Sequence, residues 1–248
     1  MARILVPLPL TDFDPTEVAV PWAALSEAGH SLIFATESGT RAAADARTLG
    51  RGEGPLPPPS LWAHADNIML YDHLVDSAAF ATPIRWADAA MADFDAILFP
   101  GGHGPGMRPY CDSADVRRLA GEAFAAGQLV AAICHGVLPL ARTRRADGQP
   151  LLDGRRTTSL TGFMERLSIW MTRRRLGDHY RTYPETVEAE TRRAIGSAGA
   201  YLRGPLLPHY ATRERADLGF IVEDGDYISA RWPGDAWTLA RRMVERLS

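Results

Sequence analysis

The sequence predicts an α/β protein with a mostly parallel sheet, and two observations support that prediction. Near the N-terminus, apolar runs over residues 3–8 and 31–36 flank a helical pattern over residues 16–28. This β–α–β order is typical of parallel strands. Further along, the run Leu129–Ile133 is apolar at every position and leads directly into a second helical pattern. Such a run indicates a strand that is buried on both faces.

The other elements continue this alternation of strand and helix. The first helix is expected to start near Pro15 and to end at Gly29. A hairpin is expected near the C-terminus, because Asp224-Gly225 favours a tight turn. Its strands are residues 220–222 and 227–230; the other expected strands are 95–99 and 156–160, and the other expected helices are 113–126, 137–142, 163–175, 185–195 and 236–247. No repeat or linker divides the chain, so we expect one domain over residues 1–248.

The stretch from about residue 50 to residue 90 has no readable regular structure. It opens with Gly50–Ser60, which is rich in glycine and proline, and it contains Trp62 and Trp86. A loop of this length in a compact domain is usually a lid or an inserted subdomain. We therefore expect an insertion or lid, with both tryptophans over the functional site or at a dimer contact.

Composition indicates a soluble globular protein. The chain has 248 residues, 46% of them hydrophobic, and a formal net charge of −3, which does not suit a nucleic-acid partner. No apolar run approaches the roughly 20 residues of a membrane span, and the N-terminus lacks the features of a signal peptide. Two cysteines cannot form a disulfide framework, so we expect a cytoplasmic protein.

The sequence contains no lysine, because all 27 basic residues are arginine. Schiff-base catalysis, a pyridoxal phosphate lysine and a Walker phosphate loop each require a lysine amine. The sequence therefore excludes these three chemistries.

Cys134-His135-Gly136 lies between the buried strand and the helix that follows it. A nucleophile at such a junction sits on a sharp turn at the carboxyl edge of the sheet. The N–H groups and dipole at the helix start favour negative charge, so they are expected to lower the pKa of the thiol and to hold an oxyanion. An arbitrary buried cysteine is more often a small core residue, but this strand–turn–helix context favours a nucleophile.

A glycine loop, Gly101–Gly106, follows the strand at residues 95–99. It does not fit the dinucleotide-binding fingerprint, because the third glycine position is Met107. Its backbone N–H groups should lie on the same sheet edge as Cys134. Two interpretations remain open: one half of an oxyanion hole, or a plain tight turn.

The histidines and the second cysteine give weaker signals. His135 is adjacent to Cys134, and whether it can act as a base depends on how the two side chains point. The histidines form no His-x-x-x-His pair, so we expect no metal site. Cys111 precedes a helix start and is expected to be structural.

Two motifs stand out at the ends of neighbouring strands: Ala131–Gly136 reads A-A-I-C-H-G, and Phe99–Gly104 reads F-P-G-G-H-G. Together they resemble the DJ-1/PfpI (ThiJ) superfamily. This resemblance implies a flavodoxin-like α/β fold with helices on both faces of the sheet, related to class I glutamine amidotransferases. The Gly-Gly-His-Gly form is most similar to the branch of heat-shock chaperone and glyoxalase III proteins. The resemblance runs through most of the chain.

Other segments resemble further parts of the family pattern. Thr16–Pro21 is similar to the first helix, which carries a glutamate beside the thiol, and this position is Glu17. Thr161–Glu165 is similar to the segment that supplies the acid of a Cys-His-acid triad. The C-terminal hairpin also resembles the family, although the sequence Arg231–Asp235 departs from its usual pattern there.

The resemblance also implies a role for each site residue. Cys134 attacks an electrophilic carbon, and the backbone N–H groups of Gly102 and His135 hold the oxyanion. His135 shuttles protons while Glu165 orients it. Glu17 carries a proton, because two anions in contact in an apolar pocket are costly. Gly101 and His103 are expected to line the substrate pocket.

The implied function is that of a cofactor-independent cysteine enzyme acting on a small electrophilic metabolite. Hydration of methylglyoxal to lactate, as in glyoxalase III, is the nearest precedent, and another hydratase, lyase or hydrolase reaction stays open because such folds host many chemistries. The expected partners are a small-molecule substrate and a second copy in a homodimer, with no nucleic acid, membrane, cofactor or metal.

Two alternatives belong to other classes. In one, the protein is a redox sensor or stress chaperone in which Cys134 is oxidised to sulfinic acid. In the other, it carries out amidase or glutamine amidotransferase chemistry. The latter ranks last, because His209-Tyr210-Ala211 lacks the glutamate of the His-x-Glu pair that those enzymes use.

Overall fold

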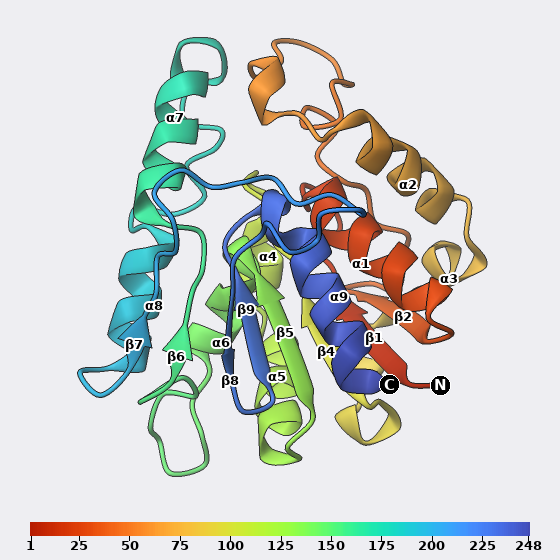
Figure 1. The fold of residues 1–248 in the computed structure, drawn as a ribbon, viewed down its shortest axis with the longest axis vertical. Coiled ribbons are helices and arrows are strands. Elements are labelled where there is room, and N and C mark those ends of the chain that lie inside the picture. The colour runs from red at the N-terminus through yellow and green to blue at the C-terminus, as the bar shows by residue number, and fades with distance from the viewer.

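The computed structural model describes all 248 residues and contains a central sheet of seven strands (Figure 1). The strand order is β3-β2-β1-β4-β5-β9-β8, and every neighbouring pair is parallel except β8 and β9. The strands are β1 Arg3–Pro7, β2 Ser31–Thr36, β3 Ile84–Arg85, β4 Ala96–Phe99, β5 Leu129–Ile133, β8 Ile221–Asp224 and β9 Tyr227–Ala230. The predicted α/β class with a mostly parallel sheet is confirmed.

Helices cover both faces of the sheet (Figure 1). On one side α1 packs against α2 and α9, and on the other α6 packs against α4, α5 and α8. The α-helices are α1 Pro15–Glu27, α2 Ala65–Val75, α3 Ala78–Ala81, α4 Met107–Asp112, α5 Ala114–Ala125, α6 Val137–Arg142, α7 Gly162–Leu176, α8 Val187–Ile195 and α9 Ala236–Leu247. Short 3-10 turns occupy Pro59–Leu61, Trp86–Asp88, Met91–Asp93, Cys134–Gly136 and Pro233–Asp235.

Strand β5 lies in the interior of the sheet, between β4 and β9. Its residues are buried throughout, as are those of β4, which explains the unbroken apolar runs in the sequence. Together they belong to one cluster of 57 buried hydrophobic residues. Because β5 is fixed on both edges and both faces, the residue that follows it is held firmly in place.

Helix α1 begins as the sequence indicates. The Asp14 side chain caps the helix by accepting from the N–H groups of Thr16 (2.8 Å) and Glu17 (3.2 Å), and Pro15 occupies the first turn. Gly29 follows the helix with a φ of +84°, a conformation that glycine adopts readily. The cap places Glu17 in the first turn of α1, at the sheet edge where the parallel strands end.

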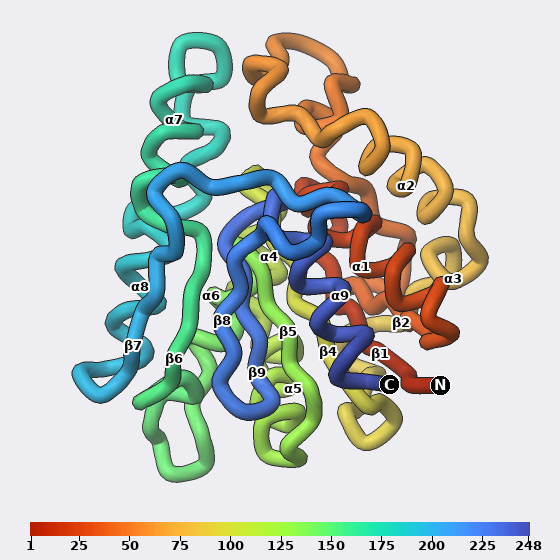
Figure 2. The backbone as a smooth tube through the Cα atoms, in the orientation of Figure 1, coloured from red at the N-terminus to blue at the C-terminus, as the bar shows by residue number.

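The stretch from residue 50 to residue 90 is more regular than its sequence suggests, since it contains α2, α3 and β3. Trp86 is buried in the core and donates its indole N–H to the carbonyl of Ala35 (3.0 Å), so it anchors β3 to the sheet. Trp62 packs within its own segment, where a Cβ on Gly50 would meet its ring. Trp86 therefore makes its contacts in the core, and Trp62 makes its contacts within its own segment. Neither set of contacts lies over the site, where both side chains were expected. The loop before α2 extends past the same sheet edge as α7 (Figure 2), and its role as a lid stays a prediction.

The predicted strand over residues 156–160 is wrong in extent and position. Only β6, Arg156–Thr157, is a strand, and it pairs in parallel with β7, Ala200–Tyr201, in a separate small sheet. The place beside β5 is occupied by β9 from the C-terminal hairpin, which forms across the predicted turn. The segment after β6 instead packs against β9, with the Thr158 N–H donating to Ser229 Oγ (2.9 Å).

No helix is both long and apolar enough to cross a bilayer.

Candidate active site

Cys134 lies on a sharp turn that joins β5 to α6. Its φ is +59°, in the left-handed region that residues other than glycine rarely adopt, so the surrounding structure must hold it there. Gly136 makes the turn possible, because a Cβ at this position would overlap the carbonyl of Phe99 on the neighbouring strand. The predicted strand–elbow–helix arrangement is confirmed.

Glu17 reaches this turn from the first turn of α1. Its Oε2 accepts a 2.7 Å hydrogen bond from the backbone N–H of Gly101, whereas its buried Oε1 has no hydrogen-bond partner. A Cβ on Gly101 would lie 2.7 Å from the backbone nitrogen of His135, 2.8 Å from Cys134 Cβ and 2.9 Å from Glu17 Oε2. The missing side chain at Gly101 therefore lets the glycine loop, the elbow and α1 converge at one point.

Burial dominates the electrostatics of this pair. It raises the pKa of Glu17 well above its ordinary value, with the nearby Asp14 acting in the same direction, and so favours the protonated carboxyl. Burial, followed by the charge of Glu17, also raises the pKa of Cys134, and the backbone N–H of His135 lowers it only in part. The prediction of a lowered thiol pKa is therefore wrong for the resting site, because desolvation outweighs the groups at the helix start.

The His135 side chain faces Cys134. Its Nδ1 lies 3.5 Å from Cys134 Sγ, and its Nε2 is buried without a hydrogen-bond partner. Burial is the main cause that holds the pKa of His135 well below its ordinary value, so the ring is neutral near pH 7. A neutral imidazole at this position can accept the thiol proton.

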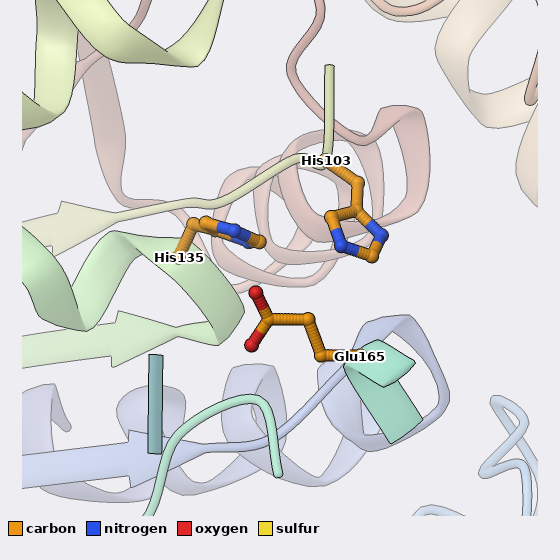
Figure 3. A group of neighbouring side chains, drawn as sticks. All are labelled: His103, His135 and Glu165. Atoms are coloured by element: carbon orange, nitrogen blue, oxygen red, sulfur yellow. The ribbon is translucent and has the colours of Figure 1, made fainter. Parts of the chain in front are cut away.

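Glu165 comes from the first turn of α7, a helix whose cap is Thr161. Its Oε2 accepts from the N–H of Val187 (2.9 Å), and it makes no hydrogen bond to His135. Ligand atoms of Glu165, His135 and His103 nevertheless lie within 4.8 Å of one another (Figure 3). Burial raises the pKa of Glu165 to about 7, so the carboxyl titrates near neutral pH.

His103 projects from the glycine loop toward this group (Figure 3). Its ring centre lies 5.0 Å from that of His135 and 5.6 Å from that of Tyr180, and its Nδ1 is 3.2 Å from Ser168 Oγ. Sequence reasoning missed Ser168 and Tyr180. Ser168 follows Glu165 by one helical turn, and that spacing could have indicated it, whereas no pattern pointed to Tyr180.

Asp12 is a third residue whose place beside the site the sequence did not reveal. Its Oδ2 accepts from the backbone N–H of Gly106 (2.7 Å), and its own φ is +69°. A Cβ on Gly102 would overlap the Asp12 carbonyl, and one on Gly104 would lie 2.7 Å from the Asp12 carboxylate. The glycines therefore let the loop wrap around Asp12, which fixes the loop beside Cys134.

Cys111 is buried, and its thiol lies 3.8 Å from the carbonyl of His135. Burial raises the pKa of Cys111, so its thiol stays protonated, in agreement with a structural role. Cys134 is only 5% exposed.

The fold and this elbow define a class: flavodoxin-like α/β proteins with a buried cysteine at the end of a central strand. Over residues 8–197 the chain matches the family described as ThiJ/PfpI family-like, and it belongs to that family. The resemblance found in the two sequence motifs is thereby confirmed.

Three relatives illustrate the similarity. An uncharacterized Schizosaccharomyces pombe protein, C14C4.04, is 24% identical over 97% of this chain and 82% of its own length. The structure of Rapid Encystment Protein 24 kDa from Francisella tularensis superposes with a TM-score of 0.74 at 18% identity, over 100% of both chains. Glyoxalase III from Candida albicans superposes with a TM-score of 0.69 at 19% identity, over 98% of this chain and 96% of its own. At these identities, the two solved structures establish the fold alone.

Proposed function

We propose that this protein is a cofactor-independent cysteine enzyme that acts on a small electrophilic carbonyl compound. The observation that carries the proposal is the position of Cys134 on a left-handed elbow, with His135 Nδ1 3.5 Å from its sulfur and the Glu17 carboxyl beside it. Strained backbone at a buried thiol with two titratable neighbours is typical of a catalytic nucleophile.

Activation of the thiol follows from the protonation states. Neutral His135 accepts the Cys134 proton at Nδ1, and the thiolate then forms a C–S bond while the carbonyl π electrons move to oxygen. Protonated Glu17 presents its free Oε1 to the same region, where it can donate a hydrogen bond without adding negative charge. In the proposed mechanism, Glu17 keeps its proton and donates a hydrogen bond, whereas His135 takes up the proton of Cys134.

Backbone N–H groups are proposed to hold the oxyanion. The N–H of Gly102 donates to no acceptor within the protein, and the N–H of His135 faces the sulfur, where it favours negative charge. The N–H of Gly101, in contrast, is already bonded to Glu17. Gly102 and His135 therefore remain as the oxyanion donors, with Gly101 and His103 lining the space beside them.

A glyoxalase III-like reaction suits this arrangement. Addition of the thiolate to the aldehyde carbon of methylglyoxal, with a proton taken up by its oxygen, gives a hemithioacetal. Removal of the proton on that carbon and protonation of the ketone oxygen give an enediol. Return of a proton to the former ketone carbon and loss of the proton from the first hydroxyl then give a lactoyl thioester. Water then cleaves the C–S bond and returns the thiol, so the net change is the addition of one water. We include Glu165 in these proton transfers as a group that acts through His135, because its pKa is about 7 and its carboxylate lies close to that ring.

The test is a panel of α-oxoaldehydes, isonitriles and amides, assayed without added cofactor on chelator-treated protein. We expect turnover of an α-oxoaldehyde to a hydroxy acid, and its loss in Cys134→Ser. Cys111→Ser is the matched control and should remain active, because Cys111 lies in the core. Activity that persists in Cys134→Ser would refute the proposal.

A redox role is the second candidate, and one observation favours it. The unpartnered Glu17 Oε1 beside Cys134 could donate a hydrogen bond to a sulfinate oxygen. Peroxide treatment should then add two oxygen atoms to Cys134 and abolish turnover while leaving the fold intact. Full activity of a peroxide-treated sample would count against a sensor.

Amidase chemistry ranks last and is tested by the amides of the panel.

We further propose a homodimer, in keeping with the expected second copy. Phe163, Leu167 and Trp170 follow one another along α7 and are 54%, 41% and 74% exposed. An apolar row of this kind is usually covered by a partner. Light scattering on the purified chain tests this, and a monomer at micromolar concentration would refute it. A cytoplasmic location likewise stays a prediction, which fractionation of cells can test.

A further inference from the structure

Two imidazoles and a carboxylate meet beside the elbow, although they come from distant parts of the chain. His103 belongs to the glycine loop, His135 to the elbow and Glu165 to α7. Each offers one ligand atom, and these atoms lie within 4.8 Å of one another (Figure 3). Two histidines and one carboxylate form a common ligand set for Zn²⁺ and other divalent first-row metals.

The hydrogen bonds of Ser168 fix the state of the His103 ring. Ser168 Oγ donates to the backbone carbonyl of Glu165 (2.9 Å), so at 3.2 Å it accepts the proton of His103 Nδ1. His103 Nε2 is then left with a lone pair, and this atom is buried without any hydrogen-bond partner. A histidine that binds a metal through one nitrogen typically donates its other N–H in this way.

His135 and Glu165 also have side-chain atoms that make no hydrogen bond. His135 Nε2 is buried and unpartnered, while its Nδ1 faces Cys134. Glu165 uses Oε2 to accept from Val187 and makes no hydrogen bond through Oε1. Unpartnered buried polar atoms are rare and require an explanation, and here two lie in one cluster. Burial keeps both rings neutral by lowering their pKa values, that of His103 to about 4, so each can offer a lone pair at pH 7.

We propose that His103 Nε2, His135 Nε2 and Glu165 Oε1 form a binding site for a divalent metal of the Zn²⁺ class, with Ser168 as the outer hydrogen-bond partner. Metal–ligand bonds of about 2.0–2.1 Å place tetrahedral ligands roughly 3.4 Å apart, so small side-chain rotations close the site. The sequence led us to expect no metal site, and the members of this cluster share no spacing along the chain.

Metal binding at His135 has a consequence for the thiol. A metal on Nε2 keeps the proton on Nδ1, so His135 can no longer accept the proton of Cys134. Bound Zn²⁺ should therefore inhibit any reaction that needs this base. The metal site itself does not rest on the proposed enzymatic function, since none of its ligands is the thiol.

The test uses tag-free, chelator-treated protein and Zn²⁺ alone, with bound metal measured by equilibrium dialysis. We expect one equivalent to bind at pH 7.5, with affinity reduced at least about tenfold in His103→Ala and in Glu165→Gln, and about tenfold in Ser168→Ala. Cys134→Ser should retain the affinity. His73→Ala removes an exposed histidine on α2 and is the matched control, which should bind as the parent protein does.

A second measurement uses Co²⁺ in place of Zn²⁺. The intensity of its visible d–d absorption bands reports the coordination geometry, and we expect the bands of a site with few ligands. Loss of metal binding in Cys134→Ser, or a sulfur-to-cobalt charge-transfer band, would overturn the proposal by indicating a thiolate site. Undiminished binding in His103→Ala, or a loss confined to His73→Ala, would overturn it as well. Thermal melts of each variant separate a lost ligand from a lost fold. Because Cys134→Ser keeps the metal and loses turnover, failure of the metal site and of the proposed enzyme are distinguishable.

Discussion

The backbone N–H of Gly101 donates a 2.7 Å hydrogen bond to Oε2 of Glu17 and joins the glycine loop to the first turn of α1. The other oxygen of the carboxyl, Oε1, is buried without a hydrogen-bond partner. The site around Cys134 thus depends on three segments that are distant in sequence. The predictions below test what each of them contributes.

Replacing Glu17 by glutamine should lower turnover by about 10²- to 10⁴-fold, the usual range for an acid–base group. The amide can still donate a hydrogen bond but cannot exchange a proton. Glu165→Gln should do less harm, because Glu165 acts through His135 and not on the reacting atoms. Both variants are assayed on the substrate found in the panel, with circular dichroism as the folding control. A larger loss at Glu165 would reverse this order.

The pH dependence of Cys134 alkylation should reveal its charge environment. Burial and Glu17 raise the pKa of this thiol, so the iodoacetamide rate should still be rising above neutral pH. The Glu17 carboxyl opposes the thiolate once it loses its own proton, and a glutamine at this position cannot ionise. The inflection of Glu17→Gln should therefore shift to lower pH. An inflection below neutrality in the parent protein would show that the backbone N–H groups outweigh desolvation.

Gly101→Ala should abolish turnover and slow alkylation of Cys134. The added Cβ would lie under 3.0 Å from atoms of Glu17, Cys134 and His135, so the loop or the elbow must move. Gly121→Ala is the matched control, because its Cβ in α5 would meet only Thr143 at 3.7 Å. That change should leave turnover intact and stabilise the helix by about 0.5–1 kcal/mol. Equal activity of both variants would contradict the close approach at Gly101.

Glu165 should make stability pH-dependent. Burial raises its pKa from 4.5 to about 7, so the folded state binds more protons than the unfolded chain between these values, and stability is lost as pH rises through the folded pKa. Glu165→Gln cannot lose a proton. Its stability relative to the parent should therefore increase from pH 4.5 to pH 8, by on the order of 3 kcal/mol. Urea titrations at several pH values measure this, and a constant difference would contradict the raised pKa.

Asp235→Asn should destabilise the fold by about 3–5 kcal/mol, since it leaves a buried charge unpaired. Asp235 accepts two hydrogen bonds of 2.9 Å from the Arg231 guanidinium, and the side chains of this pair are 1% and 0% exposed. The exposed pair of Arg85 and Asp88 is the comparison, and Asp88→Asn should leave stability almost unchanged because solvent screens an exposed ion pair. Similar losses for both variants would show that burial does not set the cost.

Much of the fold was predictable because its signals are local. The apolar run of β5, the Asp14 and Pro15 start of α1 and the turn at Asp224-Gly225 each lie within a few residues. The segment over residues 156–160 was not predictable in this way. Its β-branched threonines, Thr157 and Thr158, favour a strand. The C-terminal hairpin nevertheless occupies the place beside β5, and neither segment by itself shows which of the two will pair there.

The sequence by itself determined that Cys134 stands between a buried strand and a helix, because hydrophobic periodicity and glycine placement specify that junction. Only the tertiary structure decided the charge states at the site, since desolvation depends on how completely distant segments cover a group. It also decided that His103, His135 and Glu165 meet, with Ser168 fixing one ring. Their proximity arises from the packing of the glycine loop and α7 around the elbow, and no spacing along the chain encodes it.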